Sequence, residues 1–138
     1  MFYPFNALDV RLHTYELKHL LKMDHIINDT NQKKGLKWKR SIIDLVLSQI
    51  ALQKFYVIQD ENGNWEFVLE NEKQIFNALQ EFIWNKWNMD SGEYFDYLES
   101  CYQRRIEYCA INLCVLYTTT NETKSEFINL VKTMGGEQ

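Results

Sequence analysis

The sequence has little of the material that forms ligand-binding loops or covalent cross-links. It contains five glycines in 138 residues, and no segment matches the G-x-x-x-x-G-K-[ST] or G-x-G-x-x-G phosphate-binding patterns or the G-x-S-x-G elbow of serine hydrolases. The cysteines Cys101, Cys109 and Cys114 are odd in number and lack a close metal-binding or redox spacing. We interpret them as reduced thiols of an intracellular protein. We therefore predict no catalytic residue, no metal ion and no cofactor.

Long apolar runs are also missing. The first ten residues, MFYPFNALDV, have neither the basic start nor the apolar centre of a signal peptide. The two most apolar stretches, IIDLVLSQIAL and YCAINLCVLY, are shorter than the roughly 20 residues that cross a bilayer as a helix. We predict a cytoplasmic protein without membrane contact, located in a bacterial host cell if a phage encodes it.

What the sequence does contain is apolar and aromatic material for a single compact domain over residues 1–138. Apolar residues make up 46%, aromatics make up 14%, and there is a single proline. Such a composition is typical of globular rather than disordered chains. The charge is uneven, because residues 1–58 carry nine basic and five acidic side chains whereas residues 59–138 carry six basic and fourteen acidic ones. Lysine outnumbers arginine eleven to four, which favours an AT-rich genome such as those of many bacteria and their phages.

Hydrophobic spacing predicts a predominantly helical α+β fold, with about five helices and one two-stranded antiparallel β-hairpin over residues 55–69. Asn62 and Gly63 lie between two β-rich runs and favour a two-residue turn. That register pairs Ile58 with Phe67 and places both on one aromatic face of the hairpin. The helices are expected over about 6–27, 37–54, 72–87 and 91–117, with a last one from Thr123 to the glycines at 135 and 136.

The three histidines give no metal site on this interpretation. His13, His19 and His25 lie six residues apart in the first predicted helix. Six residues turn a helix by about 240° beyond a full circle, so the three imidazoles would point in different directions and could not share one ion. We expect His19 to lie on the apolar face as a hydrogen-bonded core histidine. The cysteines are expected to be small buried apolar side chains.

One short segment, KKGLKWKR at residues 33–40, concentrates positive charge around a tryptophan. Such a cluster fits contact with nucleic-acid phosphates, with the indole stacking on a base. The competing interpretation is a solvated loop and first helical turn whose tryptophan packs in the core, and the acidic net charge of the chain favours it. The candidate nucleic-acid contacts are Lys33, Lys34, Lys37, Trp38, Lys39 and Arg40.

A second segment, EFIWNKWNMDSGEYFDYLES at residues 81–100, mixes aromatic side chains with carboxylates. Phe82 and Phe95 fall on predicted core stripes, whereas the tryptophans and tyrosines fall beside or away from them. Trp and Tyr are enriched at interface hot spots, and carboxylates would steer this surface toward a basic partner. Packing of these rings under the hairpin or the last helix is the alternative. The candidate partner-binding residues are Trp84, Trp87, Glu93, Tyr94, Asp96, Tyr97 and Glu99.

These observations favour a non-enzymatic interaction protein that binds and inhibits or regulates a larger, nucleic-acid-handling protein through a basic surface of that partner. In size, acidity and lack of catalytic motifs the chain resembles, in general character, small phage-encoded inhibitors of host defence, anti-CRISPR proteins included. The resemblance is one of type and rests on no shared motif. Two alternatives stay open. One is an immunity-type protein that neutralises a toxin through the acidic-aromatic surface. The other is a small RNA- or DNA-binding module that uses the basic cluster at 33–40.

Overall fold

A five-stranded mixed sheet forms the centre of the computed structural model, which describes residues 9–28, 34–117 and 120–135. The strand order is β1-β5-β3-β4-β2, so β1 and β2 form the two edges. β1 runs antiparallel to β5, β5 parallel to β3, β3 antiparallel to β4, and β4 parallel to β2. The strands are β1 Val10–Glu16, β2 Ile26–Ile27, β3 Phe55–Gln59, β4 Trp65–Phe67 and β5 Ala110–Tyr117.

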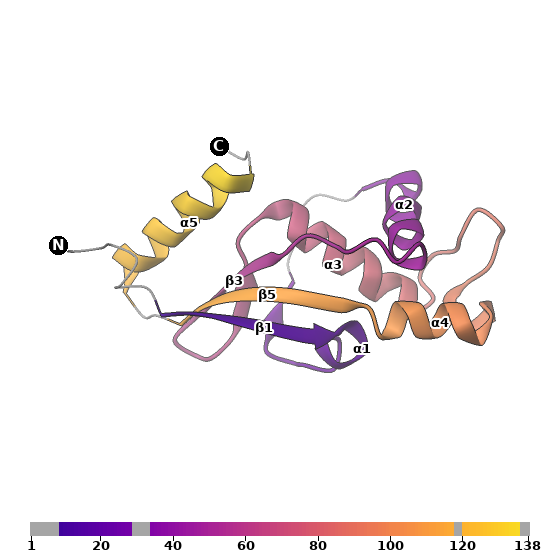
Figure 1. Cartoon of the computed structure of the whole chain (residues 1–138), viewed down its shortest axis with the longest axis horizontal. Coiled ribbons are helices and arrows are strands. Elements are labelled where there is room, and N and C mark those ends of the chain that lie inside the picture. The colour runs from indigo at the N-terminus through magenta and orange to yellow at the C-terminus, as the bar shows by residue number, and fades with distance from the viewer. Residues whose placement is uncertain (1–8, 29–33, 118–119, 136–138) are drawn as a thin grey trace.

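Helices cover both faces of this sheet unequally. Four of them contribute buried residues to one large core on the first face, and the last packs a smaller cluster onto the second face. Figure 1 shows α5 at one end of the molecule and α4 at the other. The helices in the described residues are α1 Leu17–Leu20, α2 Leu36–Leu47, α3 Glu70–Ile83, α4 Ser100–Glu107 and α5 Asn121–Gly135, with a single 3₁₀ turn η2 at Phe95–Tyr97.

The predicted predominantly helical fold with a lone hairpin is therefore wrong, and two segments account for the difference. The first, expected as a helix over 6–27, forms β1, the short α1 and β2 in its described part. In β1, alternate residues face opposite sides of the sheet. Leu12 lies on the side away from the main core and is 69% exposed. The apolar spacing that predicted a helix over 6–27 therefore includes Leu12, which the fold leaves exposed to solvent.

The second segment, expected as one helix over 91–117, divides into η2, α4 and β5. β5 lies between β1 and β3, and both of its faces are buried at their centre. Leu113 and Val115 enter the main core, while Cys114 and Leu116 pack with α5. A central strand that is buried on both faces is apolar all round, and periodicity alone does not distinguish it from a buried helix.

The predicted hairpin is present, but its register is shifted by one residue. Phe67 pairs with Val57 rather than with Ile58. The loop closes between Asp60 and Asn64, whose backbone N–H and C=O groups form a 2.8 Å hydrogen bond, and Gly63 adopts a left-handed φ of 80°. A shift of one residue exchanges the two faces of a strand. Val57 therefore shares the main core with Phe67, and Ile58 faces the smaller cluster with α5.

Two predicted helices end earlier than expected, each at a residue with left-handed backbone. α2 was expected to reach residue 54 but ends at Leu47, and Gln49 has a φ of 60°. α3 ends at Ile83, and Asn85 has a φ of 61°. A left-handed residue just past a helix commonly terminates it. Within the described residues, no helix is long and apolar enough to cross a membrane.

Candidate functional site

The most prominent surface feature is the segment between α3 and α4, residues 84–99, which we call the acidic-aromatic loop. Its inner side is pinned to the main core by aromatic rings. The ring of Phe82, at the end of α3, lies 4.8 Å from that of Trp87 and 5.9 Å from that of Phe95, between centroids. All three side chains are buried. Figure 1 shows this segment extending past α4 at one end of the molecule.

Polar contacts fix the loop's shape along its length. The Asn85 side-chain oxygen accepts a 3.0 Å hydrogen bond from the backbone N–H of Asp96, which brings the two ends of the loop together. The Gln103 amide on α4 donates to the Phe95 carbonyl at 3.0 Å. A tight turn at the tip places Gly92 at a φ of 91°, a conformation that favours glycine. The loop thus has a defined shape that is fixed by contacts within the protein.

Arg40 of α2 holds the loop from the opposite side. Its guanidinium donates to the backbone carbonyl of Asn88 at 2.8 Å and to the side-chain oxygen of the same residue at 2.9 Å. A third hydrogen bond, 2.8 Å long, reaches the carboxylate of Asp90. A guanidinium presents several donors in a fixed plane, so one side chain can secure three acceptors. Arg40 is therefore a structural clamp on the loop.

The outer side of the loop carries the predicted aromatic and acidic residues. Trp84 is 54% exposed and Tyr97 is 78% exposed, and Tyr94 is also classed as exposed. The hydrogen bond from Asp96 to Asn85 joins the sequence neighbours of Trp84 and Tyr97 at one junction of the loop. Within the loop, the exposed carboxylates that form no ion pair with any described residue are Glu93, Asp96 and Glu99.

Trp87 is the one member of the predicted surface that the structure places inside. It is 6% exposed and belongs to the main core. Its neighbour in sequence, Lys86, is exposed. The alternation of inward and outward residues in a loop follows no fixed period, so spacing could not separate the buried Trp87 from the exposed Trp84.

The basic cluster at 33–40 is largely used within the fold. Lys39 forms a 3.0 Å ion pair with Glu81 on α3, and Arg40 clamps the loop. Trp38 packs against the main core, with the Lys34 ammonium 5.6 Å from the centroid of its ring. Lys37 is exposed, and Lys33 lies outside the described residues. Of the five described members of the cluster, Trp38, Lys39 and Arg40 are thus engaged by other parts of the fold.

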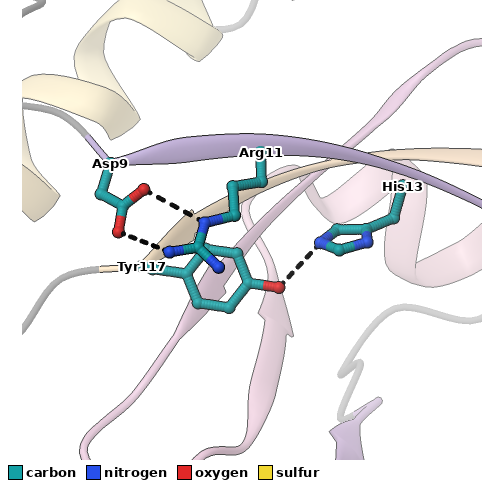
Figure 2. Close-up of polar contacts among 4 residues, drawn as sticks. All are labelled: Asp9, Arg11, His13 and Tyr117. Atoms are coloured by element: carbon teal, nitrogen blue, oxygen red, sulfur yellow. Dashed lines mark hydrogen bonds and ion pairs between the residues drawn. The ribbon is translucent and has the colours of Figure 1, made fainter.

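A group that the sequence did not reveal surrounds His13, whose side chain lies on the main-core side of β1. Its Nε2 lies 2.8 Å from the hydroxyl of Tyr117 on β5 (Figure 2). Its ring stacks on Tyr15 at 5.9 Å and contacts Trp65 at the same distance. The strand alternation in VRLHTYE is the signal for this grouping, and it was hidden by the helical interpretation of the segment.

Arg11 and Asp9 complete this group at the surface. The guanidinium of Arg11 lies 4.7 Å from the centroid of the Tyr117 ring and forms a 3.3 Å ion pair with Asp9 (Figure 2). Burial is the main cause that raises the pKa of Tyr117 above its ordinary value, and Arg11 opposes the rise. The phenol is therefore protonated near neutral pH, and its hydroxyl shares the 2.8 Å hydrogen bond with Nε2 of His13. The arrangement ties the edge strand β1 to β5.

The prediction that the three histidines lie on one helix is wrong. His13 is in β1, His19 is in α1 and forms a 3.3 Å contact with Glu16, and His25 precedes β2. His13 and His25 both contact the ring of Trp65, at 5.9 and 4.8 Å. In the part of the chain that the structure describes, no group of three or more His, Cys, Asp or Glu side chains is placed to hold a metal ion.

Comparisons with protein-family models, with curated proteins and with solved structures found no match to this chain.

Proposed function

We propose that this chain is a non-enzymatic interaction protein, and that the acidic-aromatic loop is its binding surface. One observation carries the proposal: the loop is anchored by buried rings and a guanidinium clamp, yet exposes Trp84 and Tyr97 at its surface. Large aromatic side chains left in solvent on a preformed loop are the typical anchors of protein interfaces. A preformed loop also binds at a smaller cost in conformational entropy than a loop that orders on binding.

The charge of the loop indicates the kind of partner. Glu93, Asp96 and Glu99 are exposed in the same loop as the two rings, and none of them forms an ion pair with a described cation. Carboxylates at the rim of an interface accelerate encounter with a basic surface and add little to the lifetime of the complex. We infer a partner whose surface combines positive charge with an apolar pocket for Trp84.

Grooves that hold RNA or DNA combine those two properties, because they need cations for phosphates and apolar surface for bases. A partner that handles nucleic acid would therefore lose its substrate when the loop occupies its groove. In this form the chain inhibits or regulates a larger nucleic-acid-handling protein. Direct binding of nucleic acid by residues 33–40 has less support, because Lys39 and Arg40 are held within the fold.

The experiment begins with capture of the partner by the tagged protein from a lysate of the native host, followed by mass spectrometry and purification of that partner. Calorimetric titration then compares wild type with Trp84→Ala. We expect a loss of about 2 kcal/mol or more in binding free energy, the size of a hot-spot truncation. We expect the loss in the free energy of unfolding to be well below the roughly 3–5 kcal/mol of a fully buried tryptophan, because 54% of Trp84 is exposed.

Matched controls keep the loop separate from general surface effects. Met134 on α5 is 67% exposed, so Met134→Ala removes a comparable apolar side chain elsewhere. Reversal of Glu93 and Asp96 to lysine should slow association and reduce its salt dependence, whereas Glu61→Lys at the hairpin loop should not. A single-stranded RNA oligonucleotide should compete for the partner. A folded Trp84→Ala protein with wild-type affinity would show that the loop is not the interface, and the absence of competition would show that the groove is not the target.

A further inference from the structure

A pocket of about 240 Å³ lies between α5 and the hairpin, on the second face of the sheet. Figure 1 places α5 at the end of the molecule opposite to α4, so this pocket is separate from the acidic-aromatic loop. Its walls combine apolar side chains with three lysines and two carboxylates. The lining residues are Ile58, Asp60, Glu66, Phe67, Val68, Lys73, Lys124, Ile128 and Lys132.

The α5 wall is a single row of side chains. Lys124, Ile128 and Lys132 are four residues apart, and residues at this spacing lie one above another on a helix surface. The row places an apolar side chain between two ammonium groups. Neither lysine forms an ion pair with any residue that the structure describes. Helix α5 thus presents two uncompensated cations to the pocket.

Lys73, on α3, adds a third cation. Its side chain is only 19% exposed, and the nearest carboxylate oxygen belongs to Glu66 at 3.8 Å. That distance exceeds the roughly 2.7–2.9 Å of a charge-assisted hydrogen bond. Glu66 is itself mostly in solvent, with 61% of its side chain exposed. The mostly buried Lys73 side chain therefore has capacity to donate to a closer acceptor.

The remaining carboxylate is engaged in shaping the hairpin loop. One oxygen of Asp60 accepts hydrogen bonds from the backbone N–H groups of Asn62 and Asn64, at 2.8 and 2.9 Å. The pocket as a whole has three cations against two carboxylates, of which one is held by backbone donors and the other points toward solvent.

We propose that this pocket binds a small organic oxyanion, a carboxylate or phosphate ester, with an apolar portion. The oxyanion lies among the ammonium groups of Lys73, Lys124 and Lys132, and the apolar portion packs on Val68 and Ile128. The volume sets the size, because pockets for larger drug-like ligands begin near 300 Å³. A partly desolvated site of this kind strengthens the attraction between the cations and the anion relative to water.

The test uses three probes of similar size: phenyl phosphate, benzoate and benzyl alcohol. Each is titrated into the full-length ¹⁵N-labelled protein while amide chemical shifts are followed by NMR. We expect saturable shifts at Ile58, Val68 and Ile128 with at least one of the two anions, and at least tenfold weaker binding of the neutral alcohol. The two anions distinguish a phosphate ester from a carboxylate ligand. Higher salt should weaken binding.

Variants locate the site. Lys124→Gln combined with Lys132→Gln should raise the dissociation constant of the bound anion at least tenfold, and Lys73→Gln alone should do so as well. Lys22, exposed after α1, provides the control Lys22→Gln, which should leave the dissociation constant unchanged. Amide spectra of the free variants establish that each is folded. The proposal is overturned if neither anion gives saturable shifts at these amides, if benzyl alcohol binds as tightly as the anions, or if Lys22→Gln weakens binding as much as the pocket variants.

Discussion

Glu72 provides the sharpest test of how the sheet and helices are joined. Its side chain is fully buried near the start of α3. One carboxylate oxygen accepts a 2.7 Å hydrogen bond from the backbone N–H of Tyr56 in β3, and the other accepts a 3.1 Å bond from the N–H of Leu69. β4 ends at Phe67, where the chain turns into the helix. The carboxylate therefore takes the place of a neighbouring strand as the acceptor for the N–H of Tyr56. It also caps the start of α3 by accepting from the N–H of Leu69.

The cost of Glu72→Ala follows from these two amides. A buried donor that loses its acceptor costs about 1–3 kcal/mol. The N–H of Leu69 is buried, and that of Tyr56 is partly buried and can be reached by water more easily. Removing the carboxylate also removes the cost of burying its charge. We therefore expect a loss of about 2–4 kcal/mol, a large fraction of the roughly 5–15 kcal/mol that stabilises a typical domain.

Urea unfolding followed by circular dichroism and tryptophan fluorescence would measure this loss. Glu72→Gln retains one acceptor oxygen and should lose about half as much as Glu72→Ala. Glu61→Ala, at the exposed hairpin loop, serves as the control and should change the free energy of unfolding by less than about 0.5 kcal/mol. If Glu72→Ala were as stable as the control, the buried carboxylate would not be the element that joins β3 to α3.

Three further predictions concern the core and the titrating groups. Trp87→Ala should lower the free energy of unfolding in urea by about 3–5 kcal/mol. Trp87→Phe should lower it far less, because the indole N–H has no acceptor among the described residues. Equal losses for the two variants would contradict this. Burial raises the pKa of Tyr117 above 10.0. The neutral phenol therefore stabilises the folded state below about pH 10, and this stability is lost as the pH rises through the folded pKa. Tyr117→Phe should flatten the decrease of the melting temperature with pH, and an unchanged profile would count against this reasoning. Brief iodoacetamide treatment of the native protein should alkylate Cys101 first. Cys101 is exposed, whereas burial raises the pKa of the Cys109 and Cys114 thiols. Mass spectrometry that found Cys114 modified first would contradict the fold.

The sequence predicted local features better than it predicted which segments of the chain pack or pair with one another. Turn chemistry at Asn62 and Gly63 located the hairpin, and apolar spacing located α2, α3 and α5. β1 was missed because a strand with aromatic and apolar residues on both sides also contains residues at helical spacing. Its identity as a strand is determined by pairing with β5, about a hundred residues away along the chain. No local pattern encodes that pairing.

The same reason explains what was missed at the candidate sites. Trp84 and Tyr97 are both exposed. Helical spacing indicated this for Trp84 at the end of α3, whereas the helix over 91–117 on which Tyr97 was assigned does not form, and Tyr97 lies in η2. The clamp by Arg40 and the grouping of His13 with Tyr117 depend on contacts between distant segments. The pocket beside α5 likewise requires the fold, since its lysines come from α3 and from the C-terminal helix.

The structure shows which of the unevenly distributed charges are paired within the fold. The basic N-terminal part and the acidic C-terminal part attract each other within the fold, as the pair of Lys39 with Glu81 and that of Arg40 with Asp90 show. Asp90 is therefore partly neutralised, although it belongs to the acidic-aromatic loop. Glu93 and Asp96, further along the same loop, have no such cation among the described residues. The pair of Arg40 with Asp90 holds the loop in place. Under the function proposed above, the unpaired carboxylates further along the loop are the ones that a basic partner would meet.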